Sequence, residues 1–366
     1  DRPVKGTKQK VVVAMSGGVD SSVAACLLHE QGYDVTELFM RTGVEPPEED
    51  TCAPVKPNRH RGCCSAADAS DARQVAGKLN IPFFALNFKD EFDRIIDYFA
   101  AEYQRGRTPN PCVMCNEHLK FGRLTEYGQA VDADFIATGH YARIEQRDGE
   151  HRLCRGIDPA KDQSYVLFGM GRAQLSRRLF TLGGMVKDGV RDHARRFGLT
   201  IHDKPDSVDI CFVPDRDYAK IVKQRKPEAF EQGAIVDATG KEVGRHEGVA
   251  NFTIGQRRGV GVAMGLPIYV TQLDANTNTV TIGSKEDLSR DSLEASRVQW
   301  LIEPPRDTLR ADVKIRYAHP QAPATIKVLE SNRVHVTFDD AQTAITPGQA
   351  AVFYHDDVVL GGGWID

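Results

Sequence analysis

The chain has 366 residues, of which 41% are hydrophobic and 27% are charged, and its formal net charge is −4. No apolar run approaches the roughly eighteen residues of a membrane-spanning helix, and eight cysteines are too few for a disulfide scaffold at this length. The composition therefore excludes an integral membrane protein and a small disulfide-rich protein. Residues 1–10 are polar, without an initiator Met or an apolar segment behind them, so we expect a trimmed N-terminus, no signal peptide, no membrane partner and a cytoplasmic location.

The first half of the chain alternates between apolar runs and helical patterns. Strands are predicted at residues 10–15, 34–40, 81–86 and 134–140, and helices at residues 23–31, 66–79, 91–104 and 117–131. This alternation predicts a parallel sheet with helices on its faces, and such sheets bind ligands along their carboxyl edge. Residues 41–62 are rich in Pro, Glu and Asp without periodicity, which predicts a long mobile loop beside that edge.

The last third of the chain has a different character. Short strands separated by Gly, Asn and Asp turns are predicted at residues 268–272, 279–282, 312–317, 334–338 and 351–354. We therefore expect an α/β protein with three domains. They are a Rossmann-like parallel-sheet domain at residues 1–216, a small β-rich central domain at 217–288 and a C-terminal β-barrel at 289–366.

A glycine-rich turn follows the first predicted strand. Ser-Gly-Gly-Val-Asp-Ser-Ser at residues 16–22 lies where the strand passes into a helix, so backbone N–H groups converge where a polyphosphate can sit. A polar turn that only caps a helix would explain Asp20 or Ser21, but not paired glycines flanked by serines. The pattern lacks the lysine of the P-loop and the spacing of dinucleotide-binding turns. It resembles the PP-loop of ATP pyrophosphatases, which cleave ATP between its α- and β-phosphates and leave AMP on an acceptor oxygen.

This resemblance implies a PP-loop domain of the adenine nucleotide alpha hydrolase type, with ATP and Mg²⁺ as cofactors. Asp20 would help to hold Mg²⁺, a hard cation that prefers oxygen ligands. The residues implied in binding ATP and Mg²⁺ are Ala14, Met15, Ser16, Gly17, Gly18, Val19, Asp20, Ser21, Met40 and Gly139.

Cysteines stand in two later segments, at residues 110–116 and 209–212, where polar and Pro-flanked sequence predicts loops. Here the chain resembles the tRNA-specific 2-thiouridylases of the MnmA type, which are tRNA-uridine 2-sulfurtransferases, and the resemblance covers nearly the whole chain. The signatures, in the family's order, are Gly-Arg-Thr-Pro-Asn-Pro at 106–111, Cys-Asn at 115–116, Ala-Thr-Gly-His-Tyr at 137–141, Lys-Asp-Gln-Ser-Tyr at 161–165, Ser-Val-Asp-Ile-Cys-Phe at 207–212, Gly-Gln-Arg-Arg-Gly at 255–259 and Arg-Tyr at 316–317.

The resemblance implies ATP-dependent 2-thiolation of the wobble uridine in the anticodon of Lys, Glu and Gln tRNAs. The uridine C2 oxygen would be adenylated, and sulfur would then come from a persulfide on Cys211, with Cys115 as the nucleophile. A cysteine desulfurase or a sulfur-relay protein would load the persulfide. Both thiols must reach the thiolate near neutral pH, which Lys161, Arg107 or a helix N-terminus would favour.

A base in a structured anticodon loop must be flipped out while the backbone is held electrostatically. Between residues 161 and 225 the chain carries 13 Lys and Arg against 8 Asp, a local charge of +5 that the global sum hides. The tRNA contacts implied by the resemblance are Asn110, Pro111, Cys112, His140, Lys161, Asp162, Gln163, Arg316, Tyr317 and Gln349. His140 is also open to interpretation as a structural histidine.

Cys112 departs from the family, because many members carry Asp at this position. Cys112, Cys115 and Cys211 are therefore also candidate ligands of a [4Fe–4S] cluster with one iron open to sulfide, as an alternative to the persulfide. Structural zinc is disfavoured, because Cys63-Cys64 lacks ligand spacing. Cys26, Cys52 and Cys154 are interpreted as incidental.

Two hypotheses from other classes remain open. A PP-loop ligase that forms amides needs an ammonia source, yet no glutaminase-like segment is evident, and Cys115 and Cys211 would have no task. A non-catalytic RNA-binding module that uses ATP only structurally would tolerate replacement of Cys115 by Ser.

Overall fold

The computed structural model describes residues 8–43, 65–206, 210–213, 217–262 and 264–366. Most of the loop expected at residues 41–62 lies outside the described residues, as do Cys52, Cys63 and Cys64. The chain forms two compact units, residues 1–93 with 112–216 and residues 94–111 with 217–366. The division between them passes through helix α3 (Lys89–Gln104). The three-domain division drawn from the sequence stays a prediction.

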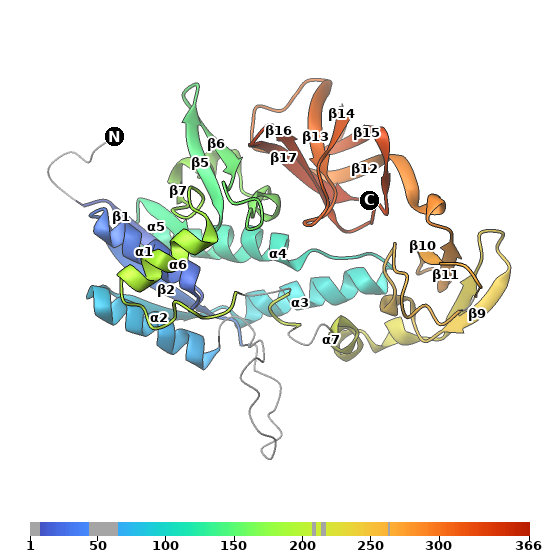
Figure 1. Ribbon diagram of the computed structural model, residues 1–366, viewed down its shortest axis with the longest axis horizontal. Helices are drawn as coiled ribbons and strands as arrows, with labels where there is room; N and C mark the ends of the chain where they lie inside the picture. The colour runs from blue at the N-terminus through green and yellow to red at the C-terminus, as the bar shows by residue number, and fades with distance from the viewer. Residues whose placement is uncertain (1–7, 44–64, 207–209, 214–216, 263) are drawn as a thin grey trace, which may run out of the picture. The chain divides into compact units, whose positions relative to one another are not determined.

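The first unit contains the expected parallel sheet, with strand order β3-β2-β1-β4-β7 (Figure 1). Its strands are β1 (Lys10–Met15), β2 (Asp34–Arg41), β3 (Phe83–Asn87), β4 (Phe135–Thr138) and β7 (Arg178–Leu179). Its longer helices are α1 (Val19–Glu30), α2 (Ala66–Leu79), α5 (Leu124–Ala130) and α6 (Lys187–Arg196). The Rossmann-like fold class is therefore confirmed.

Helix α1 lies between the parallel sheet and helix α6. On one side Ala25 and Leu28 pack in one cluster with Val13 of β1 and Phe39 of β2. On the other side, α1 packs in a cluster that includes Val190 of α6. Because both sides are covered, α1 carries apolar residues around its circumference rather than along one stripe. This burial anchors the helix whose N-terminus closes the PP-loop.

The helix that carries the first cysteine segment begins earlier than expected. The sequence predicts a loop up to residue 116, but α4 (Pro111–Met114) continues as a π-helix (Cys115–Arg123) into α5. The loop prediction is wrong for Cys112 and Cys115. Pro is tolerated at the first helical position, where its missing N–H would have no partner, so Pro111 starts this helix instead of preventing it.

A hairpin of β5 (Ala142–Arg147) and β6 (Glu150–Arg155) was missed by the sequence reading. Its turn is Asp148-Gly149, and both residues have positive φ, 53° and 78°. Two consecutive left-handed residues are the requirement of a type I′ hairpin, and Asp-Gly is a preferred pair there. The signal was therefore present in the sequence.

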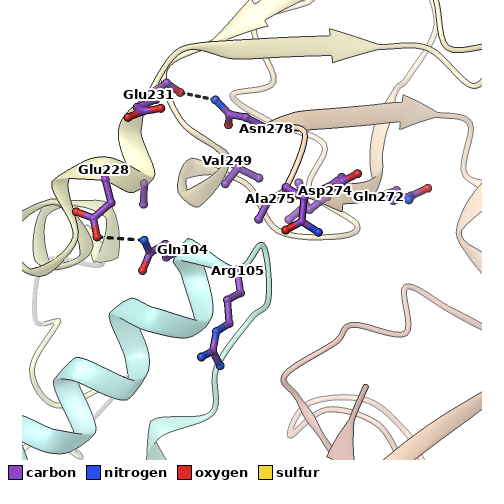
Figure 2. A pocket seen from close by; sticks show the side chains of 12 residues that line it. Gln104, Arg105, Glu228, Glu231, Val249, Gln272, Asp274, Ala275 and Asn278 are labelled. Carbon is purple, nitrogen blue, oxygen red and sulfur yellow. Dashed lines mark hydrogen bonds between the residues drawn. The ribbon is translucent and has the colours of Figure 1, made fainter.

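The second unit contains a small mixed sheet with strand order β10-β11-β8-β9. Its elements are β8 (Gly233–Val236), β9 (Glu242–His246), β10 (Tyr269–Asp274), β11 (Thr279–Gly283) and helix α7 (Tyr218–Arg225). A polar hollow of about 700 Å³ lies beside the end of α3 and the turn between β10 and β11 (Figure 2). At its edge, Gln104 donates a hydrogen bond of 3.0 Å to Glu228, and both residues belong to the second unit.

The unit ends in a closed antiparallel barrel of six strands, so the β-barrel prediction is confirmed. The strands are β12 (Ser289–Trp300), β13 (Thr308–Lys314), β14 (Ala322–Leu329), β15 (Arg333–Thr343), β16 (Ala350–His355) and β17 (Val358–Ile365). The barrel closes where β12 pairs with β17, and a Cβ added at Gly361 would lie only 2.5 Å from the carbonyl oxygen of Gln299. Glycine thus permits the close approach that closure requires. Within the described part of the chain, no helix has the length and apolar character needed to cross a bilayer.

Candidate active site

The PP-loop passes from the end of β1 into α1, and its first glycine fits against α2. Gly17 has φ +70°, and a Cβ added there would lie 2.3 Å from the backbone oxygen of Asp68. Only glycine is compatible with both the backbone conformation and this contact. Gly18 is the N-cap of α1, and no side chain caps that end. The first backbone N–H groups of α1 thus remain a suitable anion-binding surface.

The serines of the loop hold its shape. Ser21 Oγ accepts a hydrogen bond from the backbone N–H of Ser16 at 3.2 Å and donates to the Gly18 carbonyl at 3.3 Å. Ser22 Oγ donates to the same carbonyl at 2.9 Å. Both of these serines are buried, so their hydroxyls serve the loop's own conformation.

The carboxyl ends of three adjacent strands surround the loop. Ala14 and Met15 end β1, Met40 lies near the end of β2, and Gly139 follows β4. A Cβ at Gly139 would lie 2.7 Å from the backbone nitrogen of Ser21, so this glycine packs directly against the start of α1. The fold therefore gathers the residues expected to bind ATP, including Ser16 and Val19, at one sheet edge.

Asp20 is the acidic residue of the loop, and its carboxylate has two side-chain partners. Its Oδ1 accepts a hydrogen bond from the hydroxyl of Tyr141 at 2.7 Å, and the ammonium of Lys187 lies 2.7 Å and 2.9 Å from its two oxygens. Burial and the charge of Asp20 raise the pKa of Tyr141 far above its usual range, so the phenol remains a donor. Mg²⁺ prefers oxygen ligands, but here Lys187 already contacts both oxygens of Asp20, and the role of Asp20 in binding Mg²⁺ stays a prediction. The sequence reading missed Lys187, which lies 167 residues away.

Asp206 gathers three cations. It accepts from Lys161 at 2.7 Å, Lys187 at 2.8 Å and Arg191 at 3.0 Å. Burial opposes ionisation of Asp206, but the hydrogen bonds from Lys161 and Lys187 outweigh it and hold the pKa of this carboxyl below its usual value. Lys187 therefore connects the PP-loop with the segment that leads to Cys211.

Lys204 holds the PP-loop from the other side. Its ammonium donates to the carbonyl of Gly17 at 2.8 Å and lies 2.7 Å from a carboxylate oxygen of Asp68 and of Asp71. Burial lowers the pKa of Lys204, but the two carboxylates raise it by more, so the side chain stays charged. Asp68 is itself fixed in a capping box with Ser65 at the start of α2. Sequence reasoning missed Lys204 as well.

The three candidate sulfur-handling cysteines lie in the first unit. Cys112 is exposed, whereas Cys115 and Cys211 are half-buried. Residues three apart on a helix lie on the same face, so Cys112 and Cys115 project from one side of the helix that begins at Pro111. Cys211 precedes Phe212, whose ring packs edge-on against Phe92 at 5.7 Å. That contact anchors the chain next to Cys211.

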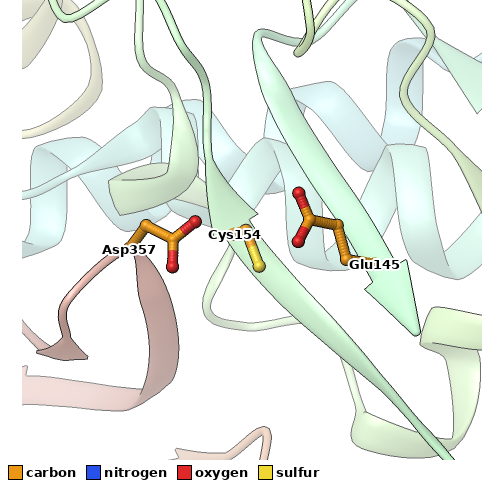
Figure 3. Close-up of side chains that lie close together, drawn as sticks. All are labelled: Glu145, Cys154 and Asp357. Carbon is orange, nitrogen blue, oxygen red and sulfur yellow. The ribbon is translucent and has the colours of Figure 1, made fainter. Parts of the chain in front are cut away.

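The cysteines interpreted as incidental and described by the structure are buried. Cys26 lies inside α1, where burial, followed by the charge of Glu37, raises the pKa of its thiol to about 12. Cys154 lies on β6, with Glu145 of β5 nearby (Figure 3). A buried thiol with a raised pKa, such as that of Cys26, is a poor nucleophile.

His140 is a buried neutral imidazole. Its Nδ1 lies 2.6 Å from the hydroxyl of Thr138, and its Nε2 lies 3.3 Å from the ammonium of Lys120. An ammonium only donates, so Nε2 accepts and Nδ1 carries the proton. Burial, followed by the charge of Lys120, lowers the pKa of His140 well below its usual value. These contacts support the structural interpretation, and its contact with tRNA stays a prediction.

Lys161, Asp162 and Gln163 form a tightly bonded segment. Asp162 accepts from the backbone N–H groups of Gly156 at 3.0 Å and Ser164 at 3.1 Å. Gln163 accepts from the backbone N–H of Tyr141 at 2.9 Å. These bonds give Asp162 and Gln163 internal structural tasks, and the expected tRNA contacts of all three residues stay predictions.

The remaining expected tRNA contacts lie in the second unit. Gln349 donates to the carbonyls of Thr108 and Pro109, at 3.1 Å each, and so lies beside the segment that leads to buried Asn110 and Pro111. Arg316 donates to the carbonyl of Thr343 at 3.2 Å. Tyr317 follows β13 and is 46% exposed, which leaves an aromatic ring at the surface.

Comparisons with known proteins cover the chain from end to end. Residues 9–215 match the family model of the tRNA methyl transferase HUP domain, residues 219–284 the tRNA methyl transferase PRC-barrel domain and residues 290–365 the aminomethyltransferase beta-barrel domain. A protein of Clostridium perfringens is 46% identical over 362 residues, 98% of this chain and 99% of its own length. One of Geobacter metallireducens is 48% identical over 365 residues, 98% of this chain and 97% of its own. Both are named tRNA-specific 2-thiouridylase MnmA, and with identity of this extent the chain belongs to the family of tRNA-specific 2-thiouridylases.

Proposed function

We propose that the protein is a tRNA-uridine 2-sulfurtransferase, which uses ATP to convert the wobble uridine of Lys, Glu and Gln tRNAs to 2-thiouridine. The observation that carries this proposal is the PP-loop geometry, with glycine-only contacts at Gly17 and Gly139 and an uncapped helix N-terminus. This geometry supports binding of a polyphosphate. The full-length similarity to named thiouridylases supports tRNA as the acceptor. A cytoplasmic location is part of the same proposal.

The first step forms an adenylate. The uridine C2 oxygen attacks the α-phosphorus of ATP, the bond to the bridging oxygen breaks, and the electron pair leaves with pyrophosphate. Mg²⁺, held by Asp20, would neutralise charge on the phosphates. The backbone N–H groups of Gly18 and the start of α1 orient the polyphosphate, and Lys204 keeps the loop in place through Gly17.

The second step transfers sulfur. The terminal sulfur of a persulfide on Cys211 attacks C2 and AMP leaves with the oxygen. The thiolate of Cys115 then attacks the Cys211 sulfur, which releases the thiocarbonyl and leaves a Cys115–Cys211 disulfide for an external thiol to reduce. A cysteine desulfurase or a relay protein would reload Cys211. The partial exposure of both cysteines supports this exchange.

The main test is nucleoside mass spectrometry of tRNA treated with the protein, ATP, Mg²⁺ and a persulfide donor. We expect 2-thiouridine, together with AMP and pyrophosphate. Release of ADP and phosphate would contradict the PP-loop assignment. Pyrophosphate release without a thiolated base would favour a different acceptor, such as that of an amide-forming ligase.

The cluster mechanism is a second candidate, because Cys112 and Cys115 lie on one face of the same helix. Together with Cys211 they would supply three cysteine ligands to a [4Fe–4S] cluster, which would carry sulfide on its open iron. Cys112→Asp separates the two mechanisms. If a persulfide acts, iron-free protein with this substitution should still thiolate tRNA. If a cluster acts, the substitution should lower both the iron content of the purified protein and its thiolation activity.

A further inference from the structure

Lys187 occupies an unusual position for a cation. It is the first residue of α6 and only 9% exposed, yet its ammonium contacts the carboxylates of both Asp20 and Asp206. Burying an ammonium is costly unless it is paired and hydrogen-bonded. Two carboxylates that lie 186 residues apart in sequence therefore hold one positive charge against the PP-loop.

Two features near Lys187 favour an incoming anion: Asp206 is shared with other cations, and the N-terminus of α1 carries no side-chain cap. Asp206 is shared among Lys161, Lys187 and Arg191, whereas Asp20 contacts Lys187 and the neutral Tyr141. With Asp158, whose carboxylate accepts the backbone N–H of Lys187 at 3.0 Å, three carboxylates balance these three cations, so the positive end of α1 is what favours an anion beside the loop. The PP-loop motif has no lysine of its own, unlike the P-loop, whose lysine reaches the terminal phosphates of the nucleotide.

We propose that Lys187 is the cation that contacts the pyrophosphate part of ATP, and that Asp206 competes with polyphosphate for its ammonium. The inference rests on the proposed function and adds a binding residue to it. The ammonium lies 2.7 Å from Asp20 in the first turn of α1, so a polyphosphate bound at the N-terminus of that helix would be within its reach. Exchange of Asp206 for a phosphate oxygen keeps the ammonium paired throughout. When the bond to the α-phosphorus breaks, Lys187 stabilises the charge on departing pyrophosphate without giving up a proton.

Binding of magnesium pyrophosphate to the whole chain, measured by titration calorimetry, tests this proposal without tRNA or sulfur. Lys187→Met should weaken pyrophosphate binding at least about tenfold, and Lys187→Arg should restore much of it, because the loss is that of a charge-assisted contact. Asp206→Asn should instead strengthen binding severalfold, because the competing charge is removed. Arg195→Met on the exposed face of α6 is the matched control and should leave binding unchanged.

The opposite signs make the result decisive. If Asp206→Asn weakens pyrophosphate binding as Lys187→Met does, the two residues are only a scaffold and the proposal is overturned. If Lys187→Met fails to fold, the sign of the Asp206→Asn effect decides alone. Failure of tRNA thiolation in the assay above, with these binding changes intact, would overturn the proposed function but not the role of Lys187.

Discussion

The PP-loop and the cysteine segments belong to one compact unit, but the chain holds them differently. The PP-loop is fixed on several sides, by Asp68 against Gly17, by Gly139 against Ser21 and by the ammonium groups of Lys187 and Lys204. The candidate cysteines are exposed or half-buried. On the proposed function, this difference has a physical reason. Displacement at phosphorus requires fixed geometry, whereas a thiol that receives sulfur from another protein must be reached from outside.

Gly17→Ala should produce the largest effect on activity, because it disturbs the PP-loop, which is the more rigidly held of the two regions. The added Cβ would lie 2.3 Å from the Asp68 backbone oxygen, and φ +70° disfavours any side chain. We expect pyrophosphate release in the presence of tRNA to fall roughly 100-fold, which a misplacement of about 1 Å can cause. Gly77→Ala is the control, because nothing lies within 4 Å of its added Cβ and it lies inside α2. Normal activity of Gly17→Ala would show that the loop is not held as described.

Cys211→Ser should abolish the sulfur-transfer step and leave the adenylation step intact. We expect 2-thiouridine to disappear from mass spectra while AMP and pyrophosphate are still released on tRNA, because the adenylation residues are untouched. Cys115→Ser should behave alike if both thiols act in sulfur transfer. If Cys211→Ser still forms 2-thiouridine, Cys211 has no part in the mechanism, and the exposure of this cysteine needs another explanation.

The sequence predicted those parts of the site that are marked by local patterns. Strand periodicity and the glycine motif located the PP-loop and the sheet edge, because both depend on neighbours in sequence. Lys187 and Lys204 were missed because they reach the loop from 167 and 187 residues away, and no local pattern marks such a pairing. The helix at Pro111 was missed because Pro was interpreted as a sign of a loop, although it is favourable at a first helical position.

The strand next to β1 contains a further test of how firmly the region around the PP-loop is held. Glu37 lies on β2 and is fully buried, and among the described residues neither of its carboxylate oxygens has a hydrogen-bond partner. Burial raises the pKa of this carboxyl to about 8, from an ordinary value of 4.5. The folded protein therefore keeps Glu37 protonated at a pH where the unfolded chain has released the proton.

The sign of the pH dependence follows from this difference. Between about pH 4.5 and pH 8 the folded state binds one more proton than the unfolded state, so Glu37 should lower the free energy of unfolding by about 1.4 kcal/mol for each unit of rising pH. Glu37→Gln removes the ionisable group and should flatten the dependence of the urea midpoint on pH, with the largest gain near pH 8. Glu30→Gln on the exposed surface of α1 is the control, because the pKa of Glu30 is lowered by its bond to Arg196 and the group stays ionised over this range. An equally steep dependence in Glu37→Gln would show that Glu37 is ionised in the folded protein, and that β2 tolerates a buried charge.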